Sequence, residues 1–342
     1  MIPEPAIPSR SEGAQDAVIQ FMSEQNVIDV VDQASVTEAI DAVFRSMALE
    51  EARNFPVVRE TLNYADAIFG FKSGFVRSGP LLGIKAGGLW PGNRDRGLPN
   101  HQSTIMLFDP ENGGPQALVC GTYLTALRTA AASALSIKYL ARPESSTLAI
   151  VGTGGQAEYQ IRAALPHGRF ERILVAGRTA ANAAALVQKL DDLEQDCHVV
   201  SIEEACRGAD VLITIALSFA PLVMSDWISA GTHVACMGTD TRGKQELDPA
   251  LVGRALCFGD APDQNARLGE YQHAVSAGLL EESQIVPLGK VMIGEHGGRS
   301  SAQDVTLFDS TGMGLQDLAA ARLALDAGIA AGKFTALDQF GG

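Results

Sequence analysis

A glycine-rich turn between a strand pattern and a helix pattern is the feature that most constrains how this chain folds. An apolar run at residues 148–151 leads directly into Gly152-x-Gly154-x-x-Ala157, and a helical pattern follows to residue 165. In such a unit the first glycine permits a tight turn, the second lets phosphates approach the main chain, and the alanine lets the helix pack closely on its strand. Backbone N–H groups at the helix N-terminus then hold a pyrophosphate. Because strand and helix are both present, the motif predicts a dinucleotide site rather than an ordinary glycine-rich turn.

The second half of the chain alternates between strand and helix patterns. Repeated units of this kind predict a parallel sheet with helices on both faces, the Rossmann-type doubly wound arrangement. The expected strands are residues 147–151, 172–176, 198–200, 211–215, 233–237, 255–258 and 305–309, and the expected helices are residues 158–165, 180–190 and 202–206.

The first half has a period of two, which is typical of strands. Glycine, proline and asparagine turns divide it into about five expected antiparallel strands, at residues 55–59, 67–72, 81–85, 104–108 and 116–120. A strand at residues 18–22 should precede them, and a helix at residues 124–140 should follow. Ser23 should cap one helix that reaches about residue 31, and Ser35-x-x-Glu38 should open the next as a capping box.

The C-terminal helix makes the expected domain organisation discontinuous. This Ala/Leu-rich pattern, at residues 314–331, follows the last expected strand of the parallel sheet and is free to return to the N-terminal half. We therefore expect an α/β fold in which residues 143–312 form the dinucleotide-binding domain and residues 17–142 with 313–342 form an antiparallel α+β domain. Residues 1–16, rich in Pro, Ser, Glu and Gly, are predicted to be a loose tail.

The composition excludes several classes of partner. With 26 basic and 40 acidic side chains the net charge is −14, which argues against a nucleic-acid or anionic membrane surface. No apolar run is long enough to span a membrane, and the N-terminus lacks the pattern of a signal peptide. The five cysteines are far apart, so neither a disulfide framework nor a metal site is predicted, and a cytoplasmic location is expected.

The end of the second strand bears on the type of dinucleotide. An acid at this position usually holds the ribose hydroxyls, but here the strand ends in Gly177-Arg178-Thr179 without a carboxylate. A small residue followed by Arg178 and Thr179 suits a 2′-phosphate, so NADP(H) is favoured over NAD(H). The alternative is that Arg178 is merely solvated.

Two further strand ends should reach the ligand, because ligands in a doubly wound sheet lie outside the carboxyl ends of the strands. One strand is followed by Ala216 and Ser218, which should lie beside the ribose of the cofactor. The other delivers Asp240 to the expected position of a nicotinamide ring. The alternative for Asp240 is a surface turn, since Asp near Gly often makes an Asx contact.

The expected antiparallel strands carry cations in apolar surroundings. Arg59, Lys72, Lys85 and Arg128 would each be costly to bury without a partner, and an anionic substrate would supply one. Structural ion pairs with the abundant carboxylates are the alternative. Asn100-His101 lies on a loop shortly after Lys85, where a histidine is more often solvated.

Several of these segments together resemble the ornithine cyclodeaminase/mu-crystallin family. They are Gly83-Ile-Lys85, Leu124-Thr-Ala-Leu-Arg-Thr-Ala-Ala131, the Gly152 loop, Met237-Gly-Thr-Asp-Thr-Arg-Gly-Lys-Gln-Glu-Leu247, Gly269-Glu-Tyr-Gln-His273 and Phe308-Asp-Ser-Thr-Gly312. The resemblance implies a Rossmann domain plus an antiparallel domain that forms a homodimer. It also implies that Lys85 and Arg128, often with Arg59, hold the substrate α-carboxylate, and that Asp240 faces the reacting nitrogen.

The resemblance completes the expected site. Lys85 and Asp240 are the candidate catalytic residues. The candidate substrate-binding residues are Arg59, Lys72, Lys85, Asn100, His101 and Arg128. The candidate cofactor-binding residues are Gly152, Thr153, Gly154, Gly155, Gln156, Ala157, Gly177, Arg178, Thr179, Ala216, Ser218, Met237, Gly238, Thr239, Asp240, Ser310, Thr311 and Gly312.

One departure from the family pattern bears on the substrate. Ornithine cyclodeaminases carry a catalytic glutamate on the strand before Lys85, where this chain has Lys72. A lysine there would repel the δ-ammonium group of ornithine and would attract a second carboxylate. Residues 70–75, 100–104 and 236–246 are also similar to the branch of the family that reduces a dicarboxylic imine to L-aspartate in the β-hydroxyaspartate pathway of glyoxylate assimilation.

We therefore expect reduction of a small 2-iminodicarboxylate such as iminosuccinate by NAD(P)H. Lys72 and His101 would receive the distal carboxylate. The alternatives are a ketimine reductase or alanine-dehydrogenase-like enzyme, an ornithine-cyclodeaminase-like enzyme on a monocarboxylic amino acid, and a non-enzymatic crystallin-like protein that binds NADPH and a small ligand.

Overall fold

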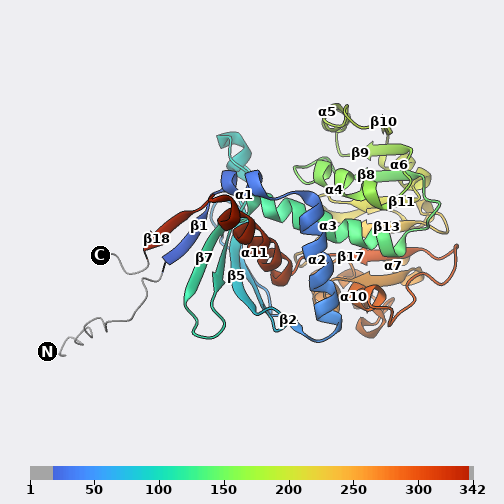
Figure 1. Cartoon of the computed structure of the whole chain (residues 1–342). Coiled ribbons are helices and arrows are strands. Elements are labelled where there is room, and N and C mark those ends of the chain that lie inside the picture. The colour runs from blue at the N-terminus through green and yellow to red at the C-terminus, as the bar shows by residue number, and fades with distance from the viewer. Residues whose placement is uncertain (1–17, 339–342) are drawn as a thin grey trace, which may run out of the picture.

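The computed structural model describes residues 18–338, so the predicted tail at residues 1–16 lies outside the described part. Two large sheets lie next to each other, with helices between them (Figure 1). The fold is α/β with a Rossmann-type parallel sheet, as expected. The division into domains at residues 142/143 and 312/313 stays a prediction.

The Rossmann-type sheet consists of parallel strands in the order β10-β9-β8-β11-β13-β17-β15-β16. From β8 the chain proceeds to β9 and β10 on one side and then returns to β11 on the other, which creates a crevice at the carboxyl ends of β8 and β11. The strand bounds are β8 Thr147–Val151, β9 Arg172–Ala176, β10 Asp196–Val199, β11 Val211–Thr214, β13 His233–Cys236, β15 Leu256–Gly259, β16 Val286–Pro287 and β17 Thr306–Asp309. A small separate sheet pairs β12 (Phe219–Val223) with β14 (Gln245–Leu247).

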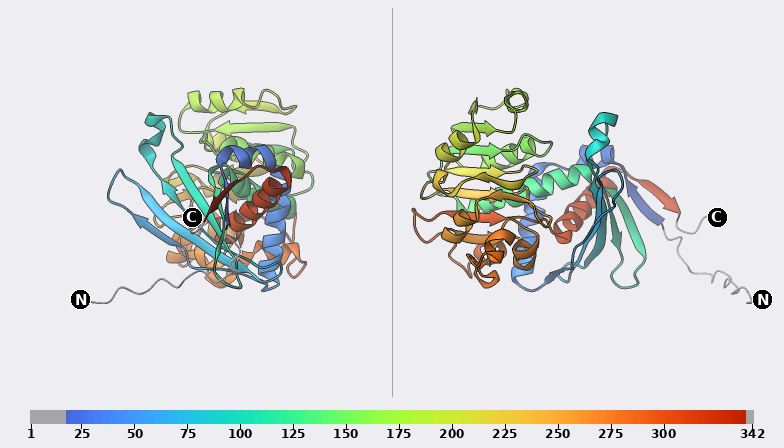
Figure 2. Two further views of the ribbon diagram at one scale, coloured as in Figure 1. Left: turned by 60° about the vertical axis from the view of Figure 1, so that its left-hand side comes forward. Right: turned by 180° about the vertical axis from the view of Figure 1, so that it is seen from behind.

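Helices cover both faces of this sheet (Figure 2). They are α4 Ala157–Ala164, α5 Ala180–Gln188, α6 Ile202–Gly208, α7 Pro249–Arg254, α8 Pro262–Arg267, α9 Gln272–Ser276 and α10 Leu288–Met292. The strands expected at residues 147–151 and 172–176 are β8 and β9 with the same bounds, because continuous apolar runs are typical of strands buried on both faces. The short helices α7 to α10 were not expected, since helices of five or six residues have too little periodicity to recognise.

The first sheet has the order β18-β1-β7-β6-β5-β4-β2, and β3 also pairs with β4. Strands β4 to β7 form the expected antiparallel meander, but β1 pairs in parallel with β7, so the sheet is mixed. The bounds are β1 Val18–Met22, β2 Ala52–Asn54, β3 Val58–Thr61, β4 Ile68–Val76, β5 Leu81–Leu89, β6 His101–Phe108, β7 Pro115–Cys120 and β18 Thr335–Asp338.

Two local expectations for this half were wrong. Of the strand expected at residues 55–59, only residues 58 and 59 are in a strand, because β2 ends at Asn54 and β3 begins at Val58. The helix expected to open with a capping box at Ser35 is α2 (Gln33–Ala48), whose N-cap is Asp32. The Asp32 carboxylate accepts from the Ser35 backbone N–H, which shifts the start of the helix toward the N-terminus. Ser23 caps α1 (Glu24–Val30), as predicted.

Helix α3 (Thr122–Leu140) connects the two halves of the molecule. It packs on α2, on α4 and on α11 (Gly314–Ala331), the C-terminal helix that returns to the first sheet as expected (Figure 1). Near the far end of α3, the Ser136 hydroxyl lies 3.1 Å from Nε2 of His233 on β13. One rigid helix therefore spans from the first sheet to the Rossmann-type sheet.

The helices of residues 18–338 cover only one face of the first sheet (Figure 2). Ser103, Ile105 and Leu107 of β6 are buried on the covered face, whereas Met106 points to the other face and is partly exposed. Ile84, Met106 and Leu118 are cross-strand neighbours, so this uncovered face has an apolar row.

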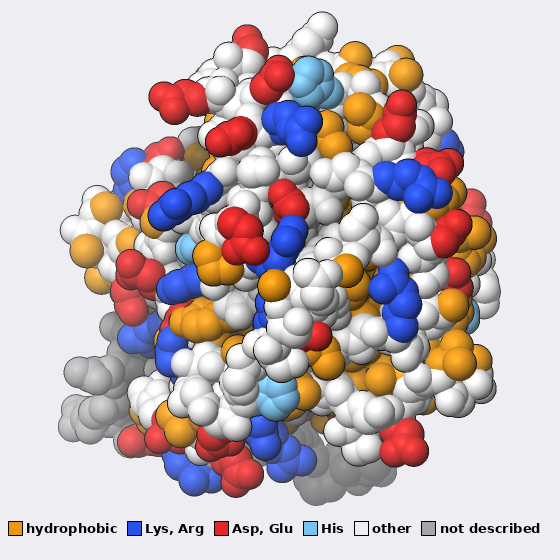
Figure 3. Space-filling model, turned by 90° about the vertical axis from the view of Figure 1, so that its right-hand side faces the viewer, with side chains coloured by type: hydrophobic (Ala, Val, Ile, Leu, Met, Phe, Trp, Pro, Cys, Tyr) orange, Lys and Arg blue, Asp and Glu red, His pale blue; other side chains and the backbone are white. Residues whose placement is uncertain are grey.

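The face of the molecule seen in Figure 3 carries charges of both signs. Acidic and basic side chains are interspersed over the face shown in Figure 3. No helix within residues 18–338 is both long and apolar enough to cross a membrane.

Candidate active site

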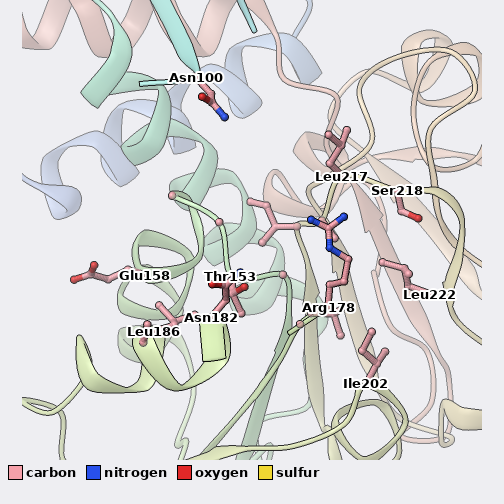
Figure 4. Close-up of a pocket in the computed structure, with 18 of the residues that line it drawn as sticks. Asn100, Thr153, Glu158, Arg178, Asn182, Leu186, Ile202, Leu217, Ser218 and Leu222 are labelled. Atoms are coloured by element: carbon pink, nitrogen blue, oxygen red, sulfur yellow. The ribbon is translucent and has the colours of Figure 1, made fainter. Parts of the chain in front are cut away.

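A cavity of about 750 Å³ lies at the carboxyl ends of β8, β9 and β11, where the topology predicts a ligand. It is lined by Thr153 and the neighbouring glycines of the β8–α4 turn, by Gly177 and Arg178 after β9, and by Ala216 and Ser218 after β11. In Figure 4 the Arg178 side chain extends into the cavity, between Thr153 on one side and Leu222 on the other.

The glycine turn fits a dinucleotide. Gly152 has φ +126°, and a Cβ there would lie 2.6 Å from the Ile215 carbonyl oxygen, so only glycine suits this position. At Gly154 and Gly155 an added Cβ would meet nothing within 4 Å, so the backbone N–H groups before α4 border open space. A pyrophosphate can therefore approach the main chain at the N-terminus of α4.

A second cavity, of about 380 Å³, continues from the first toward the first sheet. The two share Asn100, Gly154, Ile215, Ala216 and Leu217 as lining residues. An extended ligand such as a dinucleotide can thus reach from the glycine turn to the second cavity. All six candidate substrate residues line this second cavity: Arg59, Lys72, Lys85, Asn100, His101 and Arg128.

Strand register places two lysines side by side in the second cavity. Lys72 of β4 and Lys85 of β5 are directly opposite in the antiparallel pair, and both point to the covered face of the sheet. Like charges in this arrangement destabilise a sheet. Burial lowers the pKa of Lys72 to about 7 and the pKa of Lys85 to about 8. The two buried lysines are therefore stable in their charged form only if negative charge lies nearby.

Asp317 of α11 supplies part of this negative charge. Its Oδ1 accepts from Lys85 Nζ at 2.9 Å and from Arg128 Nε at 2.9 Å. Lys85 also donates to the Thr125 hydroxyl at 2.7 Å. Although burial raises the pKa of Asp317, the charges of Arg128 and Lys85 lower it to about 2. One carboxylate is thus shared between two buried cations, and both cations keep N–H donors for another anion.

Lys72 is anchored to the turn that follows β17. Its Nζ donates to the carbonyl oxygens of Thr311 at 2.9 Å and Gly312 at 3.0 Å. Asp260 holds the same turn, because its carboxylate accepts from the backbone N–H groups of Thr311 and Gly312. Gly312 has φ +73°, and a Cβ there would lie 2.6 Å from Arg128 Nη1 and 3.1 Å from Lys72 Nζ. The two cations therefore converge on this turn.

Asp240, just after β13, forms ion pairs with two cations. Its Oδ2 lies 2.6 Å from Arg59 Nη1, and its Oδ1 lies 2.7 Å from Lys244 Nζ. Burial raises the pKa of Asp240, but Arg59 and Lys244 outweigh this effect and hold it well below its usual range. Asp240 is therefore an ionised, acceptor-only group at the wall of the second cavity.

The candidate histidine is uncharged. His101 begins β6 and faces the same cavity as Lys85. Burial and the nearby charges of Lys85 and Arg128 lower the pKa of His101 to about 3. It can contribute a hydrogen bond but not a positive charge at neutral pH.

Most of the candidate cofactor residues line one of the two cavities, but three do not. Ala157 is buried at the start of α4, Thr179 is the exposed N-cap residue of α5, and the buried Thr239 hydroxyl donates to Glu270. Those that line a cavity are Gly152, Thr153, Gly154, Gly155, Gln156, Gly177, Arg178, Ala216, Ser218, Met237, Gly238, Asp240, Ser310, Thr311 and Gly312.

Sequence reasoning missed two charged residues of the site. Lys244 lies four residues after Asp240, a spacing that could have indicated the ion pair. Asp317 is an acid within an apolar helix pattern, which could have indicated a buried partner, but its cations are 189 and 232 residues away in the sequence.

A buried pair of glutamates, also missed, supports the strand ends. The Glu246 carboxylate accepts from the Thr214 hydroxyl and the Ala216 N–H after β11, and from the Gly238 N–H after β13. Glu270 accepts from the backbone N–H groups of Glu246 and Leu247. Burial raises the pKa of both glutamates, and the charge of Glu270 raises that of Glu246 further. Glu246 thereby joins the two strand ends that border the cavities.

Comparison with known proteins agrees with this geometry. The ornithine cyclodeaminase/mu-crystallin family profile matches residues 18–330. The chain is 47% identical over 305 residues to the iminosuccinate reductase of Paracoccus denitrificans, covering 89% of this chain and 95% of that protein. The crystal structure of that reductase in complex with NAD+ superposes with a TM-score of 0.89, at 45% identity over 94% of this chain and 99% of the other. An archaeal alanine dehydrogenase dimer with bound NAD has a TM-score of 0.90 at 30% identity, covering 94% of this chain and all of that chain (100%).

Proposed function

The chain belongs to the ornithine cyclodeaminase/mu-crystallin family, and from this membership and its site we propose that it is an imine reductase that converts iminosuccinate to L-aspartate with NAD(P)H. It is an oxidoreductase that acts on a C=N bond. Two observations support this assignment. The chain is 47% identical to an iminosuccinate reductase over most of both chains, and the two proteins share the same fold.

The charge of the second cavity is the observation that carries the proposal. Within the described residues, Arg59, Lys72, Lys85, Arg128 and Lys244 line the cavity, whereas Asp240 and Asp317 are the carboxylates that pair with them. Five cations thus face two carboxylates. A dicarboxylate supplies two negative charges, whereas a monocarboxylate supplies one and leaves more of the excess uncompensated.

The α-carboxylate would be held by Lys85 and Arg128. Both are fixed in orientation by Asp317 and retain N–H donors. A guanidinium group suits bidentate binding of a carboxylate, and Arg59 lies across the same cavity.

The distal carboxylate would be held by Lys72, with a hydrogen bond from His101. Lys72 uses two of its three N–H donors on the turn after β17, so one remains for the ligand. The ionised Asp240 would accept hydrogen bonds from the protonated imine nitrogen and thereby stabilise its positive charge. When bound, the nicotinamide cofactor supplies the hydride.

A direct assay tests this function. We expect nicotinamide absorbance to fall when the protein is mixed with reduced cofactor, oxaloacetate and ammonium, and we expect L-aspartate as the product on chiral chromatography. Pyruvate with ammonium is the matched monocarboxylic reaction and should be much slower. Faster formation of alanine would instead favour the alanine-dehydrogenase-like function, and cofactor binding without turnover of any 2-oxo acid would favour a binding protein.

The preferred cofactor is the next prediction. We propose NADP(H) over NAD(H), because Arg178 extends into the first cavity and no carboxylate follows β9. Arg178→Ala should weaken NADPH binding by about tenfold or more, the loss of roughly one charge-assisted hydrogen bond, and leave NADH binding unchanged. Titration of the fluorescence of the bound nicotinamide measures both affinities, with Arg178→Lys as the control. Equal weakening for both cofactors would mean that Arg178 does not read the 2′-phosphate.

We further propose that the chain forms a homodimer through the uncovered face of the first sheet. The row Ile84, Met106 and Leu118 is apolar and partly exposed on the side that no helix of residues 18–338 covers (Figure 2), and an apolar surface of this kind marks an interface. Met106→Glu should shift the protein to a monomer in analytical ultracentrifugation, whereas Met106→Leu should leave the dimer intact. A dimer that survives Met106→Glu would place the interface elsewhere.

Three further expectations remain proposals. They are a cytoplasmic location, a place in glyoxylate assimilation through the β-hydroxyaspartate pathway, and the domain division given above.

A further inference from the structure

The two ion pairs of Asp240 occupy both of its carboxylate oxygens. Arg59 comes from β3 of the first sheet, and its Nη1 also donates to the Asp240 carbonyl oxygen at 3.0 Å and the Thr241 hydroxyl at 2.7 Å. Lys244 comes from the loop that follows Asp240, so the two cations come from different segments and each pairs with a different oxygen of Asp240. Neither oxygen can carry a proton without losing a short ion pair.

Lys244 is held in place by surrounding structure. Its side chain is only 14% exposed, and its backbone N–H donates to the Thr241 carbonyl oxygen at 3.2 Å. Its own carbonyl oxygen lies 3.3 Å from Gln272 Nε2 and 3.0 Å from His273 Nε2, both on α9. These contacts hold the main chain at Lys244, and its Nζ also lies 3.4 Å from the Gly238 carbonyl oxygen. Lys244 is therefore placed to act on Asp240 rather than on bulk solvent.

An acceptor-only group distinguishes the two forms of a 2-oxo acid substrate. A protonated imine presents N–H donors and a positive charge to Asp240, whereas the carbonyl oxygen of the free 2-oxo acid presents only lone pairs to it. Hydride addition to C=NH₂⁺ returns the π pair to nitrogen and leaves a neutral amine. Hydride addition to C=O leaves an alkoxide that needs a proton, which an ionised Asp240 cannot donate.

We propose that Lys244, together with Arg59, is a specificity-determining positioning residue. By keeping both Asp240 oxygens in ion pairs, it makes the site select a protonated imine over the 2-oxo acid that the imine forms by hydrolysis. The inference rests on the proposed imine reduction, because it assumes that the reacting C=N group lies at Asp240.

The test measures how the products divide between amine and alcohol. Wild-type protein, Lys244→Met and Lys244→Arg are each supplied with oxaloacetate and reduced cofactor, with and without ammonium, and aspartate and malate are separated by chromatography. We expect Lys244→Met to lower the aspartate-to-malate ratio by roughly tenfold or more, because it removes one of the two cations that keep the Asp240 carboxylate ionised. Lys244→Arg, which keeps the charge, should restore it. A proportional loss of both products would overturn the proposal, since a merely structural role predicts that result.

Ligand binding without turnover supplies an independent measurement. With saturating reduced cofactor neither L-aspartate nor L-malate can react, and calorimetry gives the affinity of each. Wild-type protein should bind L-aspartate more tightly than L-malate. The ratio of the two affinities should be smaller in Lys244→Met and unchanged in Lys244→Arg. Equal weakening of both ligands would contradict the role given to Lys244.

The same design separates a failure of this inference from a failure of the proposed function. If the wild-type protein forms alanine from pyruvate and ammonium but no aspartate, the dicarboxylic substrate is wrong. The alanine-to-lactate ratio then tests Lys244 in the same way. A wild-type protein that reduces the 2-oxo acid as readily as the imine would overturn the inference for either substrate.

Discussion

Replacing Lys72 with alanine will raise the KM for the dicarboxylic imine by about 100-fold, while the reaction of a monocarboxylic imine will change little. Lys72 lies beside Lys85 at the cavity wall and has an N–H donor left after its two bonds to the turn at Thr311 and Gly312. A 100-fold change corresponds to about 3 kcal/mol, within the range found when one partner of a buried charge pair is removed. Steady-state kinetics with oxaloacetate plus ammonium and pyruvate plus ammonium measure the two effects.

The pH dependence distinguishes the charge of Lys72 from its packing. Burial lowers the pKa of Lys72 to about 7, so the side chain is charged below pH 7 and becomes neutral as the pH rises above it. In the wild-type protein, kcat/KM for the dicarboxylic imine should therefore fall as the pH rises through about 7. Lys72→Arg should move this decline to about pH 8, where Lys85 becomes neutral, because an arginine stays charged. Equal losses for the mono- and dicarboxylic substrates in Lys72→Ala would show that Lys72 does not select the second carboxylate.

Replacing Asp317 with asparagine will lower the free energy of unfolding by about 3–5 kcal/mol, the cost typical of leaving buried charges without their partner. Asp317 is fully buried and is shared by Lys85 and Arg128, so its loss leaves both cations uncompensated. Urea unfolding followed by circular dichroism measures the change. A small dicarboxylate such as succinate should stabilise the variant more than the wild-type protein, because it supplies the missing negative charge.

Asp326 provides the matched control on the same helix. It is paired with Arg322 on the surface, where its side chain is 54% exposed, so Asp326→Asn should cost less than about 1 kcal/mol. Equal destabilisation by the two substitutions would mean that Asp317 does not offset the buried cations.

The parts of the fold that could be predicted are those with local sequence patterns. Strands β8 and β9 and helix α11 have the expected bounds, because continuous apolar runs and an Ala/Leu-rich periodicity are visible within a few residues. The pairing of β1 with β18 could not be predicted, since it joins the two ends of the described chain. The start of α2 was misplaced because Asp32 competes with Ser35 for the cap.

The residues of the candidate site also fall into a group that could be predicted from the sequence and a group that could not. Cations in apolar surroundings and strand ends beside glycines were visible in the sequence, and the structure brings Lys72, Lys85 and Arg128 to one cavity. Their partners were not visible, because Asp317 reaches the site from the far end of the chain. The sequence therefore indicates where charge is needed, but only the folded chain shows how much of it is already balanced.

Helix α3 has a consequence for which molecules the cleft can accept. It carries Arg128 near one end and touches His233 of the Rossmann-type sheet near the other, so it acts as a spacer of constant length between the two walls. A cleft of fixed width selects its ligands by the distance between their two charged ends. We therefore expect that longer diacids would be accepted only after shorter side chains are placed at the rim of the cavity.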